Sequence, residues 1–263
     1  MDNDRRPRVV ILCGGRGARF PEETQVRPKP MVTIGGQPIL WHIMKLYSHY
    51  GLRRFVLCLG YLGNVIRDFF LRYHEHSTDA LLRLGAATEI EYVAPCPEDW
   101  EILLAETGPE TQTGGRVLAV EKYIDTDYFH LTYGDGIGDV DLDALVRCHQ
   151  QAGRLVTLTG VFPRSHYGEM TVREGEVTSF AEKPELTRAP INGGFFVVQR
   201  EALRRIPGDV PWEREPLAQL AAEGQLSCYT HRGFWHCMDT AAERDRLNSL
   251  WPEPAPWAVW RRR

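Results

Sequence analysis

The chain has 263 residues, a length that suits one large domain or two small ones. Hydrophobic residues make up 43% and charged residues 25%, which is typical of a folded globular protein and excludes a mainly disordered chain. Lys and Arg number 31 against 35 Asp and Glu, and the net charge of −4 argues against a dedicated nucleic-acid binder. A local pocket for an anionic ligand remains compatible with that charge.

Cysteine spacing and hydropathy exclude further classes. The closest cysteines, Cys228 and Cys237, are too far apart for a zinc ribbon or a thioredoxin-like site. The longest uninterrupted apolar run has five residues, far fewer than the ~20 that cross a bilayer. No secretory signal precedes the first strand-like run. We therefore expect a cytoplasmic enzyme with reduced thiols and with neither a membrane nor a nucleic acid as partner.

Buried strands alternate with helices along the first half of the chain. Continuous apolar runs predict strands, and apolar residues at helical spacing predict helices. In chain order the predicted elements are strand Val9 to Cys13, helix Pro38 to Gly51, strand Phe55 to Leu59, helix Gly63 to Tyr73, strands Thr88 to Val93 and Ile102 to Ala105, helix Thr113 to Tyr123 and strand Tyr128 to Tyr133. This order predicts an α/β fold, doubly wound around a mixed, mainly parallel sheet.

The second half of the chain is richer in strands. The predicted elements are helix Leu142 to Gln151, strand Val156 to Phe162, a hairpin of Met170 to Val172 with Val177 to Phe180, strand Phe195 to Val198, short helices near Glu201 and Glu215 around a final pair of strands, and helix Thr240 to Leu250. The tail from Trp251 to Arg263 holds three of the seven tryptophans, so we expect it to pack on another surface. No internal repeat is visible, and we expect a single domain over residues 1–263.

A glycine-rich loop follows the first strand. Gly14, Gly15 and Gly17 let the backbone approach a ligand closely, and Arg16 and Arg19 add positive charge, which suits phosphate binding. A tight turn with two solvated arginines explains the same residues. The loop is no Rossmann fingerprint, because the third glycine is missing, and no Walker A loop, because Gly-Lys-Ser/Thr does not follow.

Three charged residues stand in restrained settings. Prolines flank Lys29, which suits an ammonium group fixed on a phosphate, although a stiff surface loop has the same pattern. Asp135 stands between glycines at the carboxyl end of a strand, where ligands of open α/β sheets bind, although Asp-Gly turns are common. Asp239 precedes a predicted helix that begins at Thr240, and from these residues alone a helix N-cap is the favoured interpretation.

Several stretches of the chain belong together as a pattern: Gly14 to Arg19, Pro28 to Met31, Pro38 to Met44, Thr113 to Arg116, Tyr133 to Gly136, Glu182-Lys183-Pro184, Asn192 to Phe196 and Gly233 to Thr240. The combination resembles the sugar-1-phosphate nucleotidylyltransferases, and among them most of all the glucose-1-phosphate cytidylyltransferases. The resemblance extends from Val9 to about Trp257. Ala18 and Phe20 depart from the family's Thr and Leu, and Glu169 adds a carboxylate in the sugar half, which leaves the sugar open.

The resemblance implies a fold, a reaction and a division of the chain. It implies a Rossmann-like nucleotidyltransferase fold with a nucleotide-binding half over about 1–140, a small β-rich sugar-phosphate-binding half over about 141–250 and the tail 251–263. It also implies a homo-oligomer that uses Mg²⁺ to transfer a cytidylyl group from CTP to glucose 1-phosphate, giving CDP-glucose and pyrophosphate. Two alternatives stay open: the same chemistry with UTP, dTTP or another sugar 1-phosphate, and a non-catalytic nucleotide-sugar sensor. A dinucleotide-dependent dehydrogenase is disfavoured by the missing glycine.

The resemblance also assigns roles to residues. Lys29 would contact the α-phosphate and Arg19 the β- and γ-phosphates, while Asp135 and Asp239 would share the Mg²⁺. The nucleotide site would comprise Leu12, Cys13, Gly14, Gly15, Gly17, Arg19, Lys29, Gly115, Arg116 and Asp135, with main-chain amides of 12–15 and 115–116 toward the base. The sugar-phosphate site would comprise Tyr133, Glu182, Lys183, Asn192 and Gly193. Lys29, Asp135, Lys183 and Asp239 are all present, which counts against a non-catalytic sensor.

Overall fold

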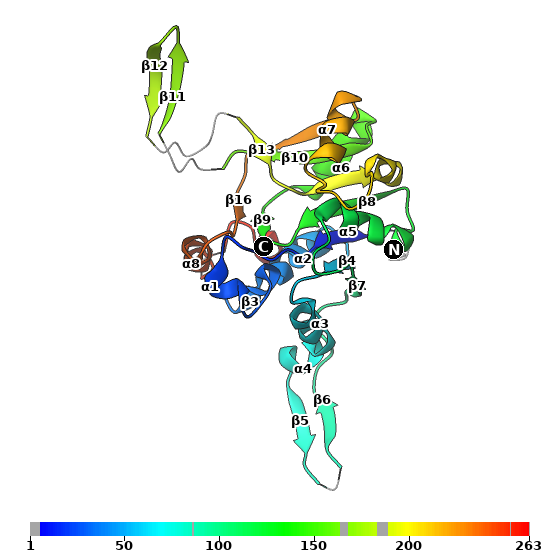
Figure 1. Ribbon diagram of the computed structural model, residues 1–263. Coiled ribbons are helices and arrows are strands. Elements are labelled where there is room, and N and C mark those ends of the chain that lie inside the picture. Colours follow the sequence, from blue (N-terminus) through cyan, green and yellow to red (C-terminus); the bar gives the residue numbers. More distant parts are fainter. Residues whose placement is uncertain (1–5, 86, 164–167, 183–188, 253, 263) are drawn as a thin grey trace.

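The structure is a computed structural model that describes residues 6–85, 87–163, 168–182, 189–252 and 254–262 (Figure 1). Its strands are β1 (Val9–Leu12), β2 (Thr33–Ile34), β3 (Gln37–Pro38), β4 (Arg54–Leu59), β5 (Ala80–Arg83), β6 (Glu89–Tyr92), β7 (Glu101–Glu106), β8 (Tyr128–Tyr133), β9 (Gly136–Gly138), β10 (Val156–Val161), β11 (Glu169–Arg173), β12 (Glu176–Ala181), β13 (Ile191–Asn192), β14 (Phe196–Gln199), β15 (Leu226–His231) and β16 (Trp235–Cys237). Its α-helices are α1 (Pro21–Thr24), α2 (Ile39–His49), α3 (Gly63–Leu71), α4 (Tyr73–Ser77), α5 (Thr113–Ala119), α6 (Leu142–Ala152), α7 (Glu215–Ala222) and α8 (Ala241–Leu250). Short 3₁₀ turns lie at Lys29–Met31, Glu121–Tyr123, Arg200–Arg205 and Val259–Arg261.

The central sheet is mixed and mainly parallel, as the sequence predicts. Seven of its eight described strands follow the order β13-β10-β14-β8-β1-β4-β7, and the eighth, β15, pairs with β10. The strands β7, β4, β1 and β8 pair in parallel, and so do β10 and β15. β14 pairs antiparallel with both β10 and β8, and β13 pairs antiparallel with β10.

Alternate side chains of β1 enter two different hydrophobic layers. Val9 and Ile11 pack in the layer that includes residues of α2, whereas Val10 and Leu12 pack in the layer that includes residues of α5 and α7. All four are buried, because helices cover both faces of the sheet, and this explains the continuous apolar run in the sequence. Several predicted elements, including α2, β4, α6 and β8, are confirmed.

The chain order of the strands reverses beside β1. From β1 the chain proceeds to β4 and β7 on one side and then returns to β8 on the other side. In open α/β sheets such a reversal opens a crevice at the carboxyl ends of the strands. The loops after β1 and β8 both lie at that crevice.

Two hairpins, β5–β6 and β11–β12, extend away from the body of the molecule (Figure 1). The second was predicted, whereas β5 was missed. The final two strands do not pair with each other: β15 joins β10, and β16 pairs with β9 beside the crevice.

The tryptophan-rich tail packs on the chain's own core. Trp257 is 1% exposed, and its indole N–H donates to Nδ1 of His42 at 3.3 Å. Trp251 and Trp260 lie edge-on or tilted against the same His42 ring. The prediction that the tail packs on a surface is thus confirmed. None of the described helices has the length and apolar character that a membrane span requires.

Candidate active site

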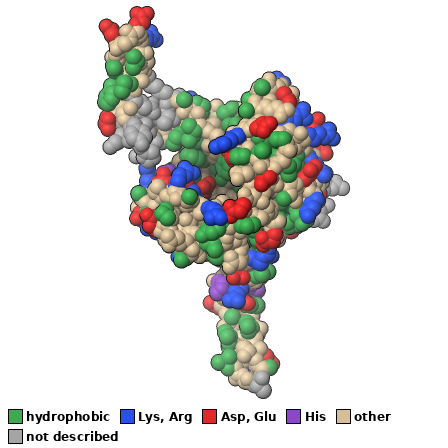
Figure 2. Space-filling model, in the orientation of Figure 1, with side chains coloured by type: hydrophobic (Ala, Val, Ile, Leu, Met, Phe, Trp, Pro, Cys, Tyr) green, Lys and Arg blue, Asp and Glu red, His purple; other side chains and the backbone are tan. Residues whose placement is uncertain are grey.

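A cavity of about 630 Å³ opens at the carboxyl ends of β1 and β8. Figure 2 shows a hollow on this face, with acidic and basic side chains around it. Most of the predicted nucleotide and sugar residues line it: Leu12, Cys13, Gly14, Gly15, Gly17, Arg19, Lys29, Arg116, Tyr133, Asp135, Asn192, Gly193 and Asp239. Residues that are distant in the sequence therefore meet in one place.

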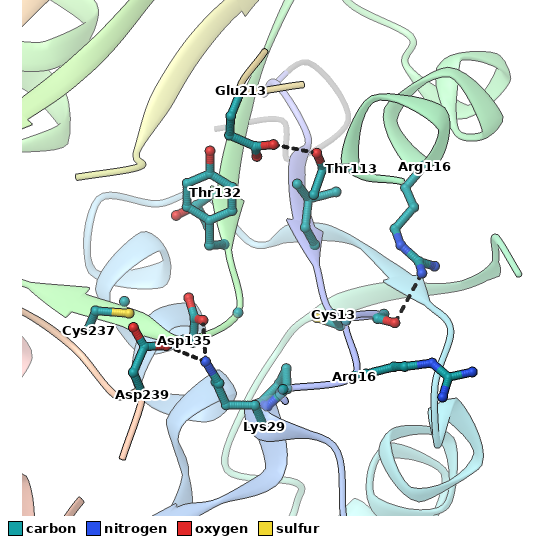
Figure 3. A pocket seen from close by; sticks show the side chains of 18 of the residues that line it. Cys13, Arg16, Lys29, Thr113, Arg116, Thr132, Asp135, Glu213, Cys237 and Asp239 are labelled. Atoms are coloured by element: carbon teal, nitrogen blue, oxygen red, sulfur yellow. Dashed lines mark hydrogen bonds and ion pairs between the residues drawn. The ribbon is translucent and has the colours of Figure 1, made fainter. Parts of the chain in front are cut away.

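A lysine lies between two carboxylates in this cavity (Figure 3). Nζ of Lys29 is 3.1 Å from Oδ2 of Asp135 and 2.5 Å from Oδ1 of Asp239. Arg19 contacts the other oxygen of Asp239 at 2.7 Å. Lys29 is 6% exposed, so the charged group is largely removed from water. Burial alone would lower the pKa of Lys29, but the carboxylates of Asp135 and Asp239 outweigh it and raise that pKa above its ordinary value.

Local backbone structure brings these side chains together. Lys29 begins the 3₁₀ turn Lys29–Met31, and the two prolines around it restrict its backbone. Asp239 comes close to Asp135 because β16 pairs antiparallel with β9, and the N–H of Met238 donates to the carbonyl of Asp135 at 2.9 Å. Burial raises the pKa of Asp135 above its ordinary value, with Lys29 acting against that rise.

Asp239 is not a helix cap, so the interpretation favoured from isolated residues was wrong. The N-cap of α8 is Thr240, whose hydroxyl oxygen accepts from the N–H of Glu243 at 3.3 Å. Glu243 in turn accepts from the N–H of Asp239 at 2.6 Å. This reciprocal pattern leaves the carboxylate of Asp239 directed at Lys29 and Arg19.

The three glycines of the first loop differ in their surroundings. Gly17 has φ +61°, a conformation that favours glycine, whereas the space where a Cβ of Gly15 would lie is open. A Cβ on Gly14 would lie 2.2 Å from the guanidinium of Arg116. Arg16 forms an ion pair with Glu110 across the cavity, and both side chains are exposed. Phe20 is fully buried in the core, and Ala18 is exposed.

Tyr133, Asn192 and Trp235 form a polar wall of the cavity. The side-chain amide of Asn192 donates to the hydroxyl of Tyr133 at 3.3 Å and accepts from the N–H of Gly194 at 2.9 Å. The indole of Trp235 donates to the carbonyl of Gly193 at 2.9 Å. Burial raises the pKa of Tyr133 far above its ordinary value, so its hydroxyl stays neutral and can both donate and accept.

Two predicted site residues that the structure describes lie elsewhere. Glu182 is exposed at the end of β12 and does not line the cavity, and neither does Gly115, which lies beside Asp209. Lys183 falls outside the described residues. Glu169 begins β11, where its backbone pairs with Ala181 of the same hairpin.

Comparison with known proteins identifies the family. Residues 8–235 match the family model described as nucleotidyl transferase. The chain is 44% identical to the glucose-1-phosphate cytidylyltransferase of Salmonella typhimurium, over 96% of this chain and 99% of that one. It is 42% identical to a probable glucose-1-phosphate cytidylyltransferase of Bacillus subtilis, over 96% and 100%.

The chain belongs to the nucleotidyl transferase family. Its relatives place it among the sugar-1-phosphate nucleotidylyltransferases, so the resemblance inferred from the motifs is confirmed. The crystal structure of HddC from Yersinia pseudotuberculosis complexed with GMP-PN has the same fold, with a TM-score of 0.67 at 21% identity over 93% of this chain and 99% of that chain. The protein is thus a nucleotidyltransferase that acts on a nucleotide and a sugar phosphate.

Nucleotidyltransferases of this family generally use a divalent metal ion, and the cavity offers donors for one. Ligand atoms of Asp135, Cys237 and Asp239 lie within 4.8 Å of one another. Two carboxylates that converge on a cationic group suit a hard divalent ion. Burial raises the pKa of the Cys237 thiol far above its ordinary value, so the thiol stays protonated and the carboxylates are the better ligands.

Sequence reasoning missed Glu110 and Glu213, which also line the nucleotidyltransferase cavity. It named the motif stretches that contain Thr113 and Trp235 but gave these two lining residues no role. Oε2 of Glu213 accepts from the Thr113 hydroxyl at 2.7 Å (Figure 3). The polar stretch 107–113 follows a parallel strand, β7, and that position could have marked it as part of the site. Glu213 precedes α7, far along the chain, and no motif or strand end in the sequence marks it as a site residue.

Proposed function

We propose that the protein transfers a cytidylyl group from CTP to α-D-glucose 1-phosphate, giving CDP-glucose and pyrophosphate. The observation that carries the proposal is the convergence of Lys29, Arg19, Asp135 and Asp239 in one cavity, next to the polar wall of Tyr133 and Asn192. The choice of CTP and glucose rests on the relatives of Salmonella typhimurium and Bacillus subtilis, whose names state that pair of specificities.

The reaction is an in-line displacement at the α-phosphorus. A phosphate oxygen of the sugar phosphate forms the new P–O bond, and the bond between the α-phosphorus and the bridging oxygen of pyrophosphate breaks. The attacking phosphate is already ionised at neutral pH, so no general base is required. The protein's task is to align two anions and to offset their charge.

Each cation of the cavity has a place in this scheme. Lys29 would contact the α-phosphate, where negative charge develops, and Arg19 would contact the β- and γ-phosphates. Asp135 and Asp239 would hold Mg²⁺, which offsets phosphate charge when bound. Tyr133, Asn192 and Gly193 would bind sugar hydroxyls, and Lys183 would bind the sugar phosphate.

A substrate matrix tests the proposal. Four nucleoside triphosphates are each combined with glucose, galactose, mannose and amino-sugar 1-phosphates, with Mg²⁺, and pyrophosphate release is measured. We expect CTP with glucose 1-phosphate to give the highest kcat/KM. Faster turnover of UTP or dTTP would overturn the assigned base, and binding without any turnover would support the sensor instead.

We propose further that the protein is a homo-oligomer, assembled through its hairpins. Both hairpins extend from the body and expose apolar side chains (Figures 1 and 2). On β5–β6, Leu82 and Ile90 are paired in register and are 56% and 53% exposed. On β11–β12, Met170 and Phe180 are likewise paired and are 57% and 61% exposed. Apolar strand pairs left in water favour burial against another copy of the chain.

Sedimentation equilibrium tests the assembly. We expect a mass of several chains for the wild type and a smaller mass for Leu82→Ser with Ile90→Thr, or for Phe180→Thr. Val26→Ser is the matched control, because Val26 is equally apolar and 68% exposed but lies outside both hairpins. A wild-type monomer at micromolar concentration would contradict the proposal.

A further inference from the structure

Arg116 reaches from α5 to the ends of three neighbouring parallel strands. Its guanidinium donates to the carbonyl of Leu59 at 3.0 Å, at the end of β4. It donates to the hydroxyl of Thr107 and to the carbonyl of Gly108, both at 2.7 Å, just after β7. It also donates to the carbonyl of Gly14 at 3.0 Å, in the loop after β1 (Figure 3). One side chain therefore ties together three loops at the crevice.

Within the part of the chain that the structure describes, the hydrogen bonds of Arg116 go to neutral groups. The side chain is 3% exposed, and the groups that accept its hydrogen bonds are three carbonyls and one hydroxyl. A buried cation that lacks a carboxylate partner costs free energy, and a well-packed apolar side chain would avoid that cost. Stability alone therefore gives a poor account of an arginine at this position.

Two glycines pack so closely against this guanidinium that neither position has space for a Cβ. A Cβ would lie 2.2 Å from Nη1 of Arg116 if added to Gly14 and 2.5 Å if added to Gly60. Neither glycine has a positive φ, so backbone conformation does not require glycine at either position. Part of the glycine-rich signal in the sequence thus reflects space for Arg116 rather than for a phosphate.

The carbonyl of Gly14 determines where the next amide points. It accepts from both Arg116 and the N–H of Tyr61, at 3.0 and 3.1 Å. The Gly14–Gly15 peptide is trans, so the N–H of Gly15 points opposite to that carbonyl, away from both donors. Gly15 lines the cavity and has open space beside it. Holding the carbonyl of Gly14 in place therefore also orients the N–H of Gly15.

We propose that Arg116 is a positioning residue, whose guanidinium holds the Gly14–Gly15 peptide so that the loop backbone is preorganised for the nucleotide. The inference rests on the proposed function for the identity of the nucleotide. It replaces the expectation that this position contributes through its main chain alone. Preorganisation of this kind strengthens binding without any added contact, because the loop loses less conformational freedom on binding.

The test compares two buried arginines. Arg116→Met keeps the length of the side chain and removes its donors, and Arg54→Met does the same for an arginine that is 4% exposed at the other end of β4. Calorimetry measures the Kd of CTP with Mg²⁺, and pyrophosphate release gives KM for both substrates. Arg116→Met should weaken CTP binding by about 10–100-fold and change the KM of the sugar phosphate less than about twofold. Arg54→Met should lower Tm and leave the CTP Kd unchanged.

Two further measurements keep the inference testable. If Arg116→Met fails to fold, Gly14→Ala displaces the guanidinium more gently and should weaken CTP binding in the same way. In Arg116→Ala, added methylguanidinium should restore CTP affinity, which a merely structural defect would not show. A folded Arg116→Met with wild-type CTP affinity overturns the inference. Nucleotide binding without turnover in the wild type overturns only the proposed function.

Discussion

Arg54 and Arg116 contact opposite ends of one strand. Arg54 is the first residue of β4, and Arg116 donates to the carbonyl of Leu59, its last residue. Both side chains are almost fully buried. Arg54 nevertheless forms ion pairs with Asp125 and with Glu101, whereas the hydrogen-bond partners of Arg116 are neutral.

The difference separates the two ends of the sheet by function. At the amino end, carboxylates of the protein balance the arginine, so no ligand is needed there. At the carboxyl end, Asp135 and Asp239 pair with Lys29 and Arg19, and Glu110 pairs with Arg16. With Arg116 and Glu213 included, the described cavity lining holds four cations and four carboxylates. A bound divalent ion would therefore give the cavity a net positive charge. Such a field favours a triphosphate in the cavity.

The largest expected effect concerns Lys29. Lys29→Ala removes the cation at the carboxyl end that we place on the α-phosphate, so kcat should fall by about 10²–10³ while KM changes little. Steady-state pyrophosphate release measures both constants. Lys45→Ala is the matched control, because Lys45 also forms a carboxylate ion pair, with Glu98 at 3.0 Å, but lies outside the cavity. Equal kcat values for the two variants would show that Lys29 has no role in the reaction.

Asp239 and its neighbour Thr240 should give opposite results. Asp239→Asn should weaken Mn²⁺ binding by at least ~10–100-fold, the cost of losing a residue that only supports a metal ligand. Electron paramagnetic resonance measures the Mn²⁺ affinity. The substitution should leave α8 folded, because Thr240 caps that helix, and any fall in Tm should be small, because Lys29 keeps its ion pair with Asp135. Thr240→Ala should reduce the free energy of unfolding by about 1 kcal/mol and leave Mn²⁺ affinity intact. A lower Tm with full Mn²⁺ affinity in Asp239→Asn would contradict the assigned ligand.

Elements whose signal is local were predictable. The period of α2 and the apolar runs of β4 and β8 are visible in short windows, and the turn at Glu174-Gly175 marks the β11–β12 hairpin. The strand Ala80–Arg83 was missed, because its leucines are exposed and no buried face imposes a period of two. The partners of β15 and β16 were also beyond the sequence, because long-range pairing decides them.

The candidate site was predictable where motifs stand at strand ends. The glycine-rich loop and Asp135 were found in this way, and Lys29 was found by its flanking prolines. Gly14, Gly15, Arg16, Gly17, Arg19, Lys29 and Asp135 all line the cavity. The motif Thr240-Ala-Ala-Glu243 is a capping signal that would have excluded Asp239 as the cap, had it been weighed. The direction of the Arg116 side chain could not be read from the sequence, because it depends on loops that meet only in the folded sheet.

Acidification should destabilise the protein through His130, a buried histidine at the amino end of the sheet. His130 pairs with Val9 at the amino end of β1 and is 1% exposed, and burial lowers its pKa to about 3. Below pH 6.5 the unfolded chain therefore binds a proton that the native protein excludes, and stability falls until about pH 3. The loss attributable to His130 approaches ~1.4 kcal/mol per pH unit. Urea unfolding between pH 7 and 4 should show a shallower pH dependence for His130→Gln, and parallel curves would contradict the assignment.

The smallest expected effect concerns the ion pair of Arg16 with Glu110 across the cavity. Both side chains are mostly exposed, 64% and 68%, so water and salt screen their attraction. Glu110→Gln frees Arg16 for the anionic nucleotide and should lower the KM of CTP, by less than about threefold at low salt. The difference should vanish near 0.5 M KCl, where the Debye length is a few ångströms, about 4 Å. Arg53→Gln is the control, because it breaks a similarly exposed ion pair, with Asp99, outside the cavity. If Glu110→Gln still changes the KM of CTP at high salt, the ion pair affects the structure of the site and not only its electrostatic attraction for the nucleotide.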